Sequence, residues 1–325
     1  MAAPQPITRV AVVGAGLMGH AIASACAIAG VRVRLTDIDR RVLAAAGKKI
    51  DRILATLVEC RALARRRAAA ARSRIEFAGS LEAAVAGAHL VQESIQEDAA
   101  LKGRLFAELD ELCPPATILA TNTSSIRITE IADATTRPDR VVGVHWVSPA
   151  YVVPVVEVVT GRATSPRTVR RATEYVRRLA RVPVVVKDTP GFVINRVQMA
   201  MLNEAIDLVE RGVATAEDVD AAIRIGLGSR LAIFGPLLCN DIFVTKETTL
   251  RLLAYLYGKT GQEKFKPSGL LRRMVKARDN GVFSGQGFFR YRGAPESVLG
   301  RRDRALVGFM RSLRKFERGG LASLG

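Results

Sequence analysis

Short apolar runs alternate with longer amphipathic stretches along the first part of the chain. Apolar runs of about four to eight residues predict buried strands, and stretches with apolar residues three or four positions apart predict helices. This alternation continues to about residue 187 and is typical of a parallel sheet covered by helices on both faces. The predicted strands are residues 10–13, 31–35, 75–77, 89–95, 117–122, 140–146, 152–159 and 182–186.

The amphipathic stretches divide the chain into two regions. Residues 40–72 are rich in alanine, arginine and leucine and are too long for a simple crossover, so we expect a helical hairpin that projects from the sheet. Beyond residue 187 only helices are predicted, with breaks at Gly226-Leu-Gly228 and at Gly235-Pro236. We therefore predict an α/β domain over residues 1–187 and an all-helical domain over residues 188–325. The other predicted helices are residues 101–112, 165–180, 193–213, 215 onward, 268–279 and 296–316.

A glycine-rich turn connects the first predicted strand to an alanine-rich helix. Its residues are Gly14, Ala15, Gly16, Leu17, Met18 and Gly19. Gly14 permits the tight turn, Gly16 leaves room for a pyrophosphate, and Gly19 lets the helix pack closely on the strand. Unpaired N–H groups at the helix amino terminus favour the bound diphosphate. Asp37 follows the second strand, where a carboxylate accepts hydrogen bonds from a ribose diol and favours NAD over NADP. The first domain is predicted to be a doubly wound, Rossmann-type NAD-binding domain.

Histidine occurs three times, and one position stands out. His20 follows the glycine turn and His89 begins a strand, which favours structural roles for both. His145 lies near the end of the run VVGVHW, and open α/β sheets bind ligands at the carboxyl ends of their strands. Glu157 interrupts the apolar run VVPVVEVV, where an unpaired carboxylate would be costly to bury. We expect His145 to take the proton of an alcohol as hydride leaves, with Glu157 fixing the imidazole tautomer. The alternative is a surface histidine and an unrelated glutamate.

The formal net charge of +18 is unusual for a chain of globular composition. Arginine gathers within residues 61–74 and 301–318, which favours polyanions such as nucleic acid, dinucleotides or coenzyme A esters. No helix-turn-helix, finger or stacking-aromatic pattern accompanies the charge, so no specific nucleic-acid partner is expected. The chain shows no membrane-length apolar run and no signal-peptide core, and its four cysteines lack metal or disulfide spacing. We expect a cytoplasmic protein without a metal site.

The motifs together resemble the 3-hydroxyacyl-CoA dehydrogenase family over nearly the whole chain. The matching segments are GAGLMG, Glu97-Asp98 with Lys102, Thr121-Asn-Thr-Ser-Ser125, His145 with Glu157, Asp188-Thr-Pro-Gly-Phe-Val-Ile-Asn195-Arg196, and Ser284-Gly-Gln-Gly-Phe-Phe-Arg-Tyr291. The resemblance implies an NAD-dependent homodimer that oxidises a 3-hydroxy group of L stereochemistry. It also implies that the helical domain carries the dimer interface and part of the substrate cleft.

The resemblance also implies roles for single residues. In that family the residue matching His145 is the acid and base, and the residue matching Glu157 holds it. The residues matching Ser124 and Asn195 hydrogen-bond the substrate oxygen or the catalytic histidine. Taken alone, Ser124 and Ser125 also fit a cap for the following helix, and Asn195 also fits a polar residue in a helix's first turns. The positions that lie around the nicotinamide ribose in that family match Glu97, Lys102 and Asn122.

Two departures from the family pattern bear on the substrate. The acyl-CoA enzymes commonly read His-Phe-Phe-Asn-Pro, whereas this chain reads His145-Trp-Val-Ser148-Pro149, so Ser148 replaces an asparagine near the nicotinamide amide. Residues 226–236 are similar to the segment of gulonate dehydrogenase (lambda-crystallin) and carnitine dehydrogenase, which act on free hydroxy acids. Arg230 is there a candidate clamp for a substrate carboxylate, and a structural salt bridge is the other interpretation. A hydroxyacyl-CoA is the favoured substrate. The alternatives are a free hydroxy acid, or a non-catalytic protein that senses NAD(H) or binds nucleic acid.

Overall fold

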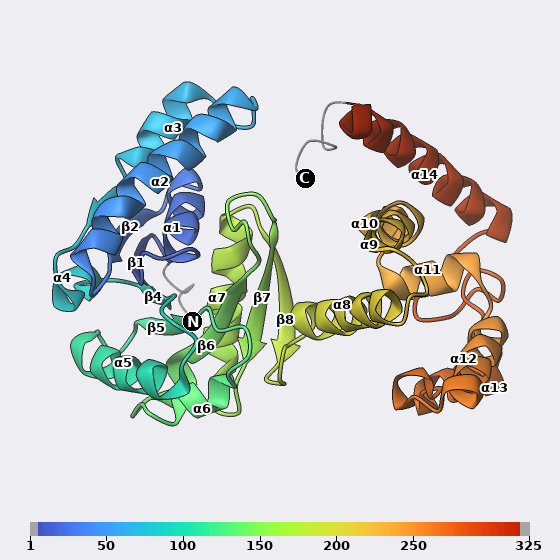
Figure 1. Cartoon of the computed structure of the whole chain (residues 1–325). Coiled ribbons are helices and arrows are strands. Elements are labelled where there is room, and N and C mark those ends of the chain that lie inside the picture. The colour runs from blue at the N-terminus through green and yellow to red at the C-terminus, as the bar shows by residue number, and fades with distance from the viewer. Residues whose placement is uncertain (1–5, 319–325) are drawn as a thin grey trace. The chain divides into compact units, whose positions relative to one another are not determined.

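A computed structural model describes residues 6–318 and contains an eight-stranded sheet in the order β3-β2-β1-β4-β5-β6-β7-β8. The first six strands of that order follow the pattern of dinucleotide-binding sheets and confirm the predicted fold class (Figure 1). The predicted strands are all present, with ends shifted by a few residues. They are β1 (Arg9–Val13), β2 (Arg32–Thr36), β3 (Ile75–Phe77), β4 (Leu90–Glu93), β5 (Ile118–Thr121), β6 (Val141–Trp146), β7 (Val155–Thr160) and β8 (Val182–Lys187).

The sheet is mixed, and this corrects the expectation of a parallel sheet. Strands β1 to β6 pair in parallel, but β7 runs antiparallel to β6, and β8 is parallel to β7. The connection of residues 147–154 between β6 and β7 is too short for a crossover helix, so the chain returns beside the strand it has just left. As a result, the side chains at the carboxyl end of β6 lie directly opposite side chains of β7.

Helices cover both faces of the sheet. On one face α1 (Gly19–Ile28), α2 (Arg40–Glu59), α3 (Arg65–Arg72) and α7 (Pro166–Arg178) share an apolar cluster with the strands. On the other face lie α4 (Leu81–Val85), α5 (Ala99–Leu112) and α6 (Ile128–Ala132). Helices α2 and α3, which lie where a helical hairpin is predicted, pack on each other and on α1 (Figure 1). A short 3-10 turn, η1 (Pro138–Arg140), precedes β6.

The chain divides into two compact units, Met1–Met201 and Leu202–Gly325. The division falls within α8 (Ile194–Glu210), and the second unit is helical in its described part. Gly235, with φ +73°, separates α10 from α11 as expected. The expected break at Gly226 and Gly228 is wrong, because both glycines lie inside the π-helix η2, which joins α9 to α10 without a gap. The remaining elements are α9 (Ala216–Ala221), η2 (Ala222–Gly228), α10 (Ser229–Phe234), α11 (Pro236–Phe243), α12 (Lys246–Thr260), η3 (Glu263–Phe265), α13 (Gly269–Ala277) and α14 (Pro295–Arg318).

In the described part of the chain, no single helix is both long and apolar enough to cross a membrane; the helical stretches Ala216–Phe234 and Pro236–Phe243, bent by 99°, reach that length and composition only as a pair. Among residues 6–318, no three or more His, Cys, Asp or Glu side chains gather in a way that could hold a metal ion.

Candidate active site

The turn between β1 and α1 requires glycine at two positions for steric reasons. Gly14 has φ +97°, and a Cβ there would lie 2.5 Å from the carbonyl oxygen of Ser94. A Cβ on Gly19 would collide with the carbonyl of Gly14, so the first turn of α1 rests directly on the backbone. Gly16 is different, because a Cβ there would meet no atom within 4 Å. The protein itself therefore leaves open space beside Gly16.

Asp37 ties the end of β2 to this glycine turn. Its Oδ2 accepts a hydrogen bond from the backbone N–H of Ala15 at 2.7 Å, and its Oδ1 accepts one from Asp39 at 2.9 Å. No described side chain caps the amino terminus of α1. Next to the open space Leu17 is exposed and Met18 is partly buried. The uncapped N–H groups and the carboxylate thus lie at the same edge of the sheet, as a dinucleotide site requires.

His145 and Glu157 are direct partners across β6 and β7. The antiparallel register places them opposite each other, and His145 Nδ1 lies 2.8 Å from Glu157 Oε2. Both side chains are buried, with 4% of His145 and none of Glu157 exposed. An ionised carboxylate can only accept hydrogen bonds, so Nδ1 carries the proton and Nε2 is left unprotonated in the neutral ring. The pair that the sequence predicts is therefore present, and the alternative of unrelated side chains is wrong.

The second oxygen of Glu157 is held by the start of α8. Glu157 Oε1 accepts hydrogen bonds from the backbone N–H groups of Val193 at 3.0 Å and Ile194 at 3.1 Å. Burial alone would raise the pKa of Glu157, but the hydrogen bonds from His145 and from these N–H groups lower it below its ordinary value. Phe192 packs its ring 5.7 Å from that of His145. The carboxylate is thus ionised and immobile beside the imidazole.

Ser124 lies on the Nε2 side of the imidazole, and Asn195 contacts the backbone of Ser124. Ser124 Oγ is 3.2 Å from His145 Nε2, and Asn195 Nδ2 donates to the carbonyl oxygen of Ser124 at 3.4 Å. The interpretation of Ser124 and Ser125 as a helix cap is wrong, because α6 begins at Ile128 and its first N–H groups bond elsewhere. The carboxylate of Asp188 accepts those bonds, from the N–H groups of Ile128 and Thr129 at 2.9 Å each.

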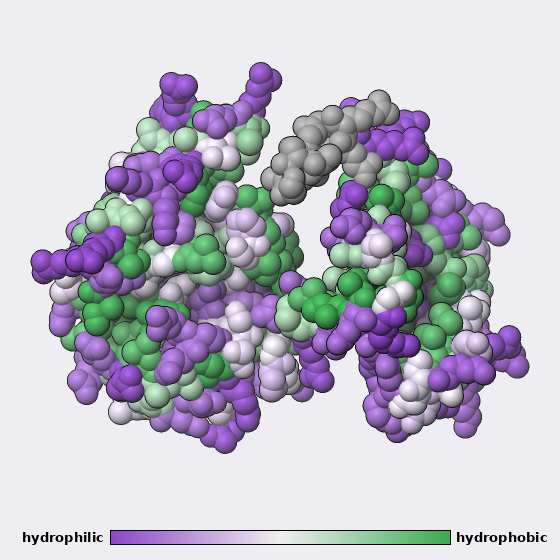
Figure 2. Space-filling view, viewed as in Figure 1, coloured by the Kyte–Doolittle hydropathy of each residue, from purple (hydrophilic) through white to green (hydrophobic). Residues whose placement is uncertain are grey.

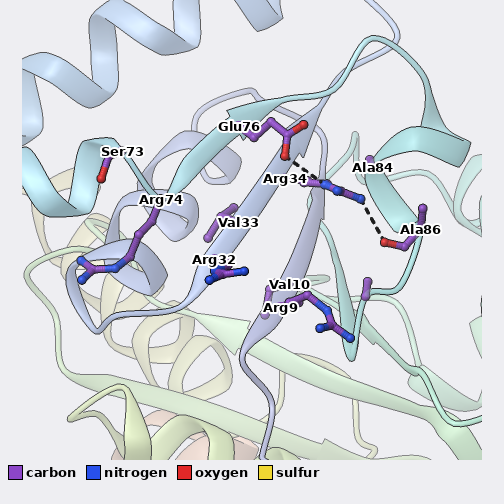
Figure 3. Close-up of a pocket in the computed structure, with 11 residues that line it drawn as sticks. Arg9, Val10, Arg32, Val33, Arg34, Ser73, Arg74, Glu76, Ala84 and Ala86 are labelled. Carbon is purple, nitrogen blue, oxygen red and sulfur yellow. Dashed lines mark hydrogen bonds and ion pairs between the residues drawn. The ribbon is translucent and has the colours of Figure 1, made fainter.

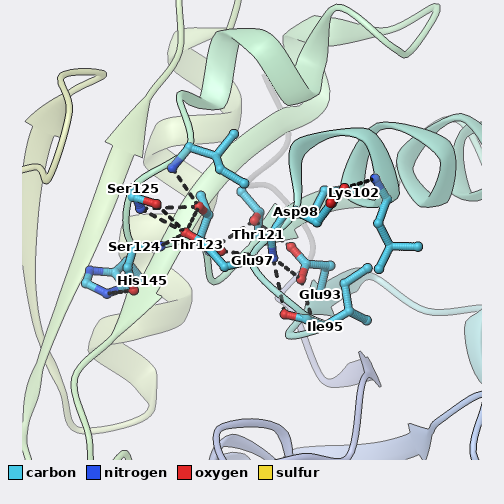
Figure 4. A network of polar contacts seen from close by, with 12 residues as sticks. Glu93, Ile95, Glu97, Asp98, Lys102, Thr121, Thr123, Ser124, Ser125 and His145 are labelled. Atoms are coloured by element: carbon cyan, nitrogen blue, oxygen red, sulfur yellow. Dashed lines mark hydrogen bonds and ion pairs between the residues drawn. The ribbon is translucent and has the colours of Figure 1, made fainter.

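Glu97 anchors the loop that carries Ser124 (Figure 4). Its Oε1 accepts hydrogen bonds from the Thr123 hydroxyl at 2.6 Å and from the N–H groups of Ser124 at 2.9 Å and Ser125 at 3.0 Å. Burial opposes ionisation, but the Thr123 and Ser125 hydroxyls and the nearby Lys102 lower the pKa of Glu97 to about 2. Glu97 is therefore ionised and holds the backbone on which Ser124 approaches His145.

Sequence reasoning missed Glu93, which lies at the end of β4 next to this loop. Its Oε1 accepts from Lys102 Nζ at 2.6 Å and its Oε2 from the Thr121 hydroxyl at 2.6 Å, and none of Glu93 is exposed. Lys102 Nζ also lies 3.4 Å from Glu97 Oε2 (Figure 4). The signal was available, because Glu93 ends an apolar strand just as Glu157 interrupts one. The resemblance places Lys102 near the nicotinamide ribose. Its side chain is only 1% exposed, and its ammonium already contacts the carboxylates of Glu93 and Glu97.

Asn122 and Arg230, two further predicted site residues, each form hydrogen bonds with backbone groups. Asn122 Oδ1 accepts the backbone N–H of Trp146 at 2.9 Å, so Asn122 links the carboxyl ends of β5 and β6. Arg230, in the second unit, donates Nε to the carbonyl of Gly226 at 3.0 Å and lies 5.6 Å from the centre of the Phe243 ring. It forms no ion pair with any residue of the described chain, which removes the structural salt bridge considered from sequence.

A sheet in this strand order, with a glycine turn after β1 and an acid after β2, is the fold of NAD-binding oxidoreductases. Comparisons with known proteins agree. The 3-hydroxyacyl-CoA dehydrogenase NAD binding domain matches residues 9–189, and the C-terminal domain of the same family matches residues 191–291. The chain belongs to the 3-hydroxyacyl-CoA dehydrogenase family, and it is an NAD-dependent oxidoreductase acting on a CH–OH group.

Individual relatives cover nearly the whole chain. A probable 3-hydroxybutyryl-CoA dehydrogenase of Bacillus subtilis is 40% identical over 285 residues, 88% of this chain and 98% of the relative. A 5-formyl-3-hydroxy-2-methylpyridine 4-carboxylate 5-dehydrogenase of Mesorhizobium japonicum is 33% identical over 314 residues, 94% of this chain and 98% of the relative. The crystal structure of a 3-hydroxyacyl-CoA dehydrogenase of Archaeoglobus fulgidus matches with a TM-score of 0.79 and 32% identity, covering 94% of this chain and 99% of that one.

Proposed function

We propose that this protein oxidises the 3-hydroxyl group of a 3-hydroxyacyl-CoA to a ketone, as a step of fatty acid metabolism. The observation that carries the proposal is the buried His145–Glu157 contact of 2.8 Å in a member of this family. The Bacillus subtilis relative, named as a probable 3-hydroxybutyryl-CoA dehydrogenase, supports the choice of substrate.

The groups around the glycine turn fit NAD. The space beside Gly16, the uncapped start of α1 and the carboxylate of Asp37 suit a pyrophosphate and an adenosine ribose. When bound, NAD supplies the acceptor for the hydride of the alcohol carbon. The nicotinamide end of the proposed NAD site includes Glu97, Lys102 and Asn122. Their polar atoms mostly bond protein groups, so we propose that they shape this part of the site by holding the surrounding backbone in place.

In the proposed mechanism His145 accepts the proton of the substrate hydroxyl. Its unprotonated Nε2 takes the hydroxyl proton of the substrate as hydride leaves, so the ring becomes an imidazolium. Glu157 accepts the Nδ1–H throughout and stabilises this positive charge, because its carboxylate is buried 2.8 Å away. Ser124, 3.2 Å from Nε2, holds the ring and offers its hydroxyl to the substrate oxygen, and Asn195 holds the backbone of Ser124. In the reverse direction the imidazolium returns the proton to the ketone oxygen.

A direct test follows the absorbance of reduced nicotinamide as the purified enzyme reduces acetoacetyl-CoA. We expect turnover by the wild type and a loss of about 10³-fold in H145Q, within the usual range for removing a general acid or base. His89 provides the matched control, because its Nδ1 contacts the backbone N–H of Thr8 rather than any active-site group. H89Q should keep wild-type activity. Turnover that survives in H145Q would show that another group moves the proton.

A free hydroxy acid is the second candidate substrate. The Mesorhizobium relative is named for a pyridine carboxylate rather than a coenzyme A ester, and Arg230 has no acidic partner in the described chain. A guanidinium without a carboxylate partner suits a substrate carboxylate. A panel of free 3-hydroxy acids with NAD decides between the two. Turnover of free acids without turnover of acyl-CoA, with R230A raising only the KM for the acid, would establish the second candidate.

We further propose a cytoplasmic homodimer. The helix α8 exposes apolar side chains along its length, and Figure 2 shows apolar residues over this helix on the face in view. Exposed apolar surface of this kind marks interaction sites and supports the dimer. The cytoplasmic location is supported by the cysteines, which are free thiols and suit a reducing compartment.

The dimer can be tested in solution. Light scattering on the full chain gives the mass in solution, and a monomer at micromolar concentration would contradict the dimer. The exposed apolar residues of α8 include Val197, Met199, Met201, Leu202, Ile206 and Val209.

A further inference from the structure

A hollow of about 260 Å³ lies at the amino-terminal edge of the sheet, where β1, β2 and β3 begin (Figure 3). Its polar lining comes from Arg9, Arg32, Arg34, Ser73, Arg74 and Glu76. We call it the arginine hollow. The glycine turn and His145 lie at the carboxyl ends of the parallel strands, and five residues of β1 separate the two edges by roughly 16 Å. The arginine hollow is therefore distinct from the active site proposed above.

The lining of the arginine hollow carries an uncompensated positive charge. It contains four arginines and one carboxylate, that of Glu76, so its formal charge is +3. Glu76 pairs with Arg34 at 3.1 Å, and within residues 6–318 no acidic side chain forms an ion pair with the other three arginines. Arg9 and Arg32 are also direct partners in the register of β1 and β2. The two strands are parallel and both arginines are exposed, so their like charges lie side by side at the surface, where a bound anion would reduce their mutual repulsion.

Neutral carbonyl groups accept hydrogen bonds from three of the guanidinium groups, and that of Arg74 points away from the others, with Nη1 donating to the carbonyl of Ala27 in α1 at 3.4 Å (Figure 3). Arg9 donates Nε to the carbonyl of Gly87 at 2.8 Å, and Arg34 donates Nη1 to the carbonyls of Ala83 at 3.1 Å and Ala86 at 3.0 Å. These bonds orient the side chains without cancelling their charge. Arg32 projects from the same strand face, and its guanidinium has no hydrogen-bond partner within residues 6–318 (Figure 3). Guanidinium donors thus line a space in which Glu76 is the single acidic lining residue that the structure describes.

We propose that the arginine hollow binds a phosphoryl oxyanion, as inorganic diphosphate or as the phosphate end of a nucleotide. Guanidinium groups match phosphate oxygens with paired N–H donors, and a ligand of two or three negative charges offsets the +3 of the lining. The hollow, of about 260 Å³ and open to solvent, has room for a diphosphate group.

Calorimetric titration of the full-length enzyme tests the proposal. Saturating NADH is present throughout, so that phosphate cannot enter the dinucleotide site. We expect diphosphate to bind the wild type, and ADP to bind comparably if the phosphate end of a nucleotide is the natural ligand. The double variant R9A/R32A should bind at least about tenfold more weakly, a change of about 1.4 kcal/mol. The control R104A removes an exposed arginine of α5 outside the hollow and should bind like the wild type.

Melting temperatures separate a binding role from a structural one. Diphosphate should raise the melting temperature of the wild type and R104A but not of R9A/R32A. Without ligand, R9A/R32A lacks both the adjacent like charges and the Arg9 hydrogen bond to Gly87, so the effect of diphosphate is measured against the variant's own melting temperature. Equal diphosphate affinity in all three proteins would overturn the proposal, as would loss of binding on saturation with NADH. Duplex DNA that displaces diphosphate from the same arginines at lower concentration would also overturn it, in favour of a nucleic-acid surface. None of these outcomes depends on the dehydrogenase activity.

Discussion

Glu157 in the first unit and Asp241 in the second are fully buried carboxylates that each accept a hydrogen bond from a basic side chain. Glu157 bonds to His145 and to two backbone N–H groups. Asp241 bonds to Lys246 Nζ at 2.5 Å, to the N–H groups of Phe288 and Phe289, and to the hydroxyl of Tyr291. In both cases burial raises the pKa of the acid, and the hydrogen bonds lower it overall.

The two pairs differ in whether the basic side chain has a nitrogen that can still accept a proton. His145 Nε2 lies on the side of the ring away from Glu157, 3.2 Å from the hydroxyl of Ser124. Lys246 is fully buried, with its ammonium between Asp241 and the ring of Phe288, 5.1 Å from the ring centre. Gly281 and Gly287 let the backbone close on Asp241, because a Cβ at either would collide with it. The groups of the Asp241–Lys246 pair bond only within the protein and stabilise the fold, whereas the unprotonated Nε2 of His145 can accept a proton from a substrate.

The largest expected effect comes from breaking the closed pair. D241A leaves the Lys246 ammonium buried without a carboxylate, and we expect the free energy of unfolding to fall by about 3–5 kcal/mol. Denaturant unfolding followed by circular dichroism measures it. The matched control is D207A, which removes a partly exposed acid paired with Arg211 and should cost less than about 1 kcal/mol. Equal costs for the two variants would mean that the Asp241–Lys246 pair contributes little to stability.

Changing the open pair should affect catalysis more than stability. E157Q keeps the side-chain volume but removes the charge that stabilises the imidazolium, so we expect kcat to fall by about 10²-fold. NADH binding should stay unchanged, because Glu157 contacts only His145 and the start of α8 among described groups. Steady-state kinetics and NADH titration measure both quantities. A kcat within a factor of two of the wild type would remove Glu157 from our proposed mechanism.

A smaller effect should follow from changing the hydroxyl on the free side of the imidazole. S124A removes a hydrogen bond of 3.2 Å to His145 Nε2. One such bond is worth about 0.5–1.5 kcal/mol, so kcat should fall by roughly two- to tenfold. Ser125 provides the control, because its hydroxyl bonds to Glu97 and not to His145. S125A with the larger loss of activity would show that anchoring the loop matters more than the contact with the ring.

The smallest expected effect is a loss of stability on changing Glu97, a carboxylate that is hydrogen-bonded like Glu157 and Asp241 but only partly buried. Its pKa falls from 4.5 to about 2 in the folded protein, so its stabilising contribution is present above pH 4.5 and is lost as the pH falls toward 2. E97Q should therefore be less stable than the wild type at pH 7, and the two should converge at low pH. The side chain is 39% exposed, so solvent screening limits the difference to about 1 kcal/mol. Unfolding curves at several pH values test this, and a pH-independent difference would contradict it.

Much of this architecture can be read from local pattern, and the errors have identifiable causes. Apolar runs located every strand of the sheet, and the amphipathic stretch of residues 40–72 predicted the hairpin of α2 and α3. The direction of β7 was missed, because an apolar run looks the same whichever way its neighbour runs. The continuity of α9, η2 and α10 was missed because helical neighbours hold Gly226 and Gly228 in a π-helix despite their low helix propensity.

Some contacts of the site could also be predicted from the sequence, and others could not. His145 and Glu157 could be predicted as partners because each is a polar residue in an apolar run, and burial forces such residues to find each other. Glu93 had the same signal, but its partner Lys102 lies on a helix, and no strand register indicated the contact. The cap of α6 by Asp188 was also beyond prediction, because the two lie 59 or 60 positions apart in the chain.

The sequence alone determined which segments become strands and helices, where the glycine turn lies and which polar residues must be paired when buried, because these depend on near neighbours and on the cost of burying charge. The tertiary structure decided that β7 returns antiparallel, so that Glu157 faces His145 in register. It also decided that the start of α8 closes on the second oxygen of that carboxylate, and that Arg9 meets Arg32 at the other edge of the sheet. Such contacts depend on how distant segments pack, and no local pattern in the chain records them.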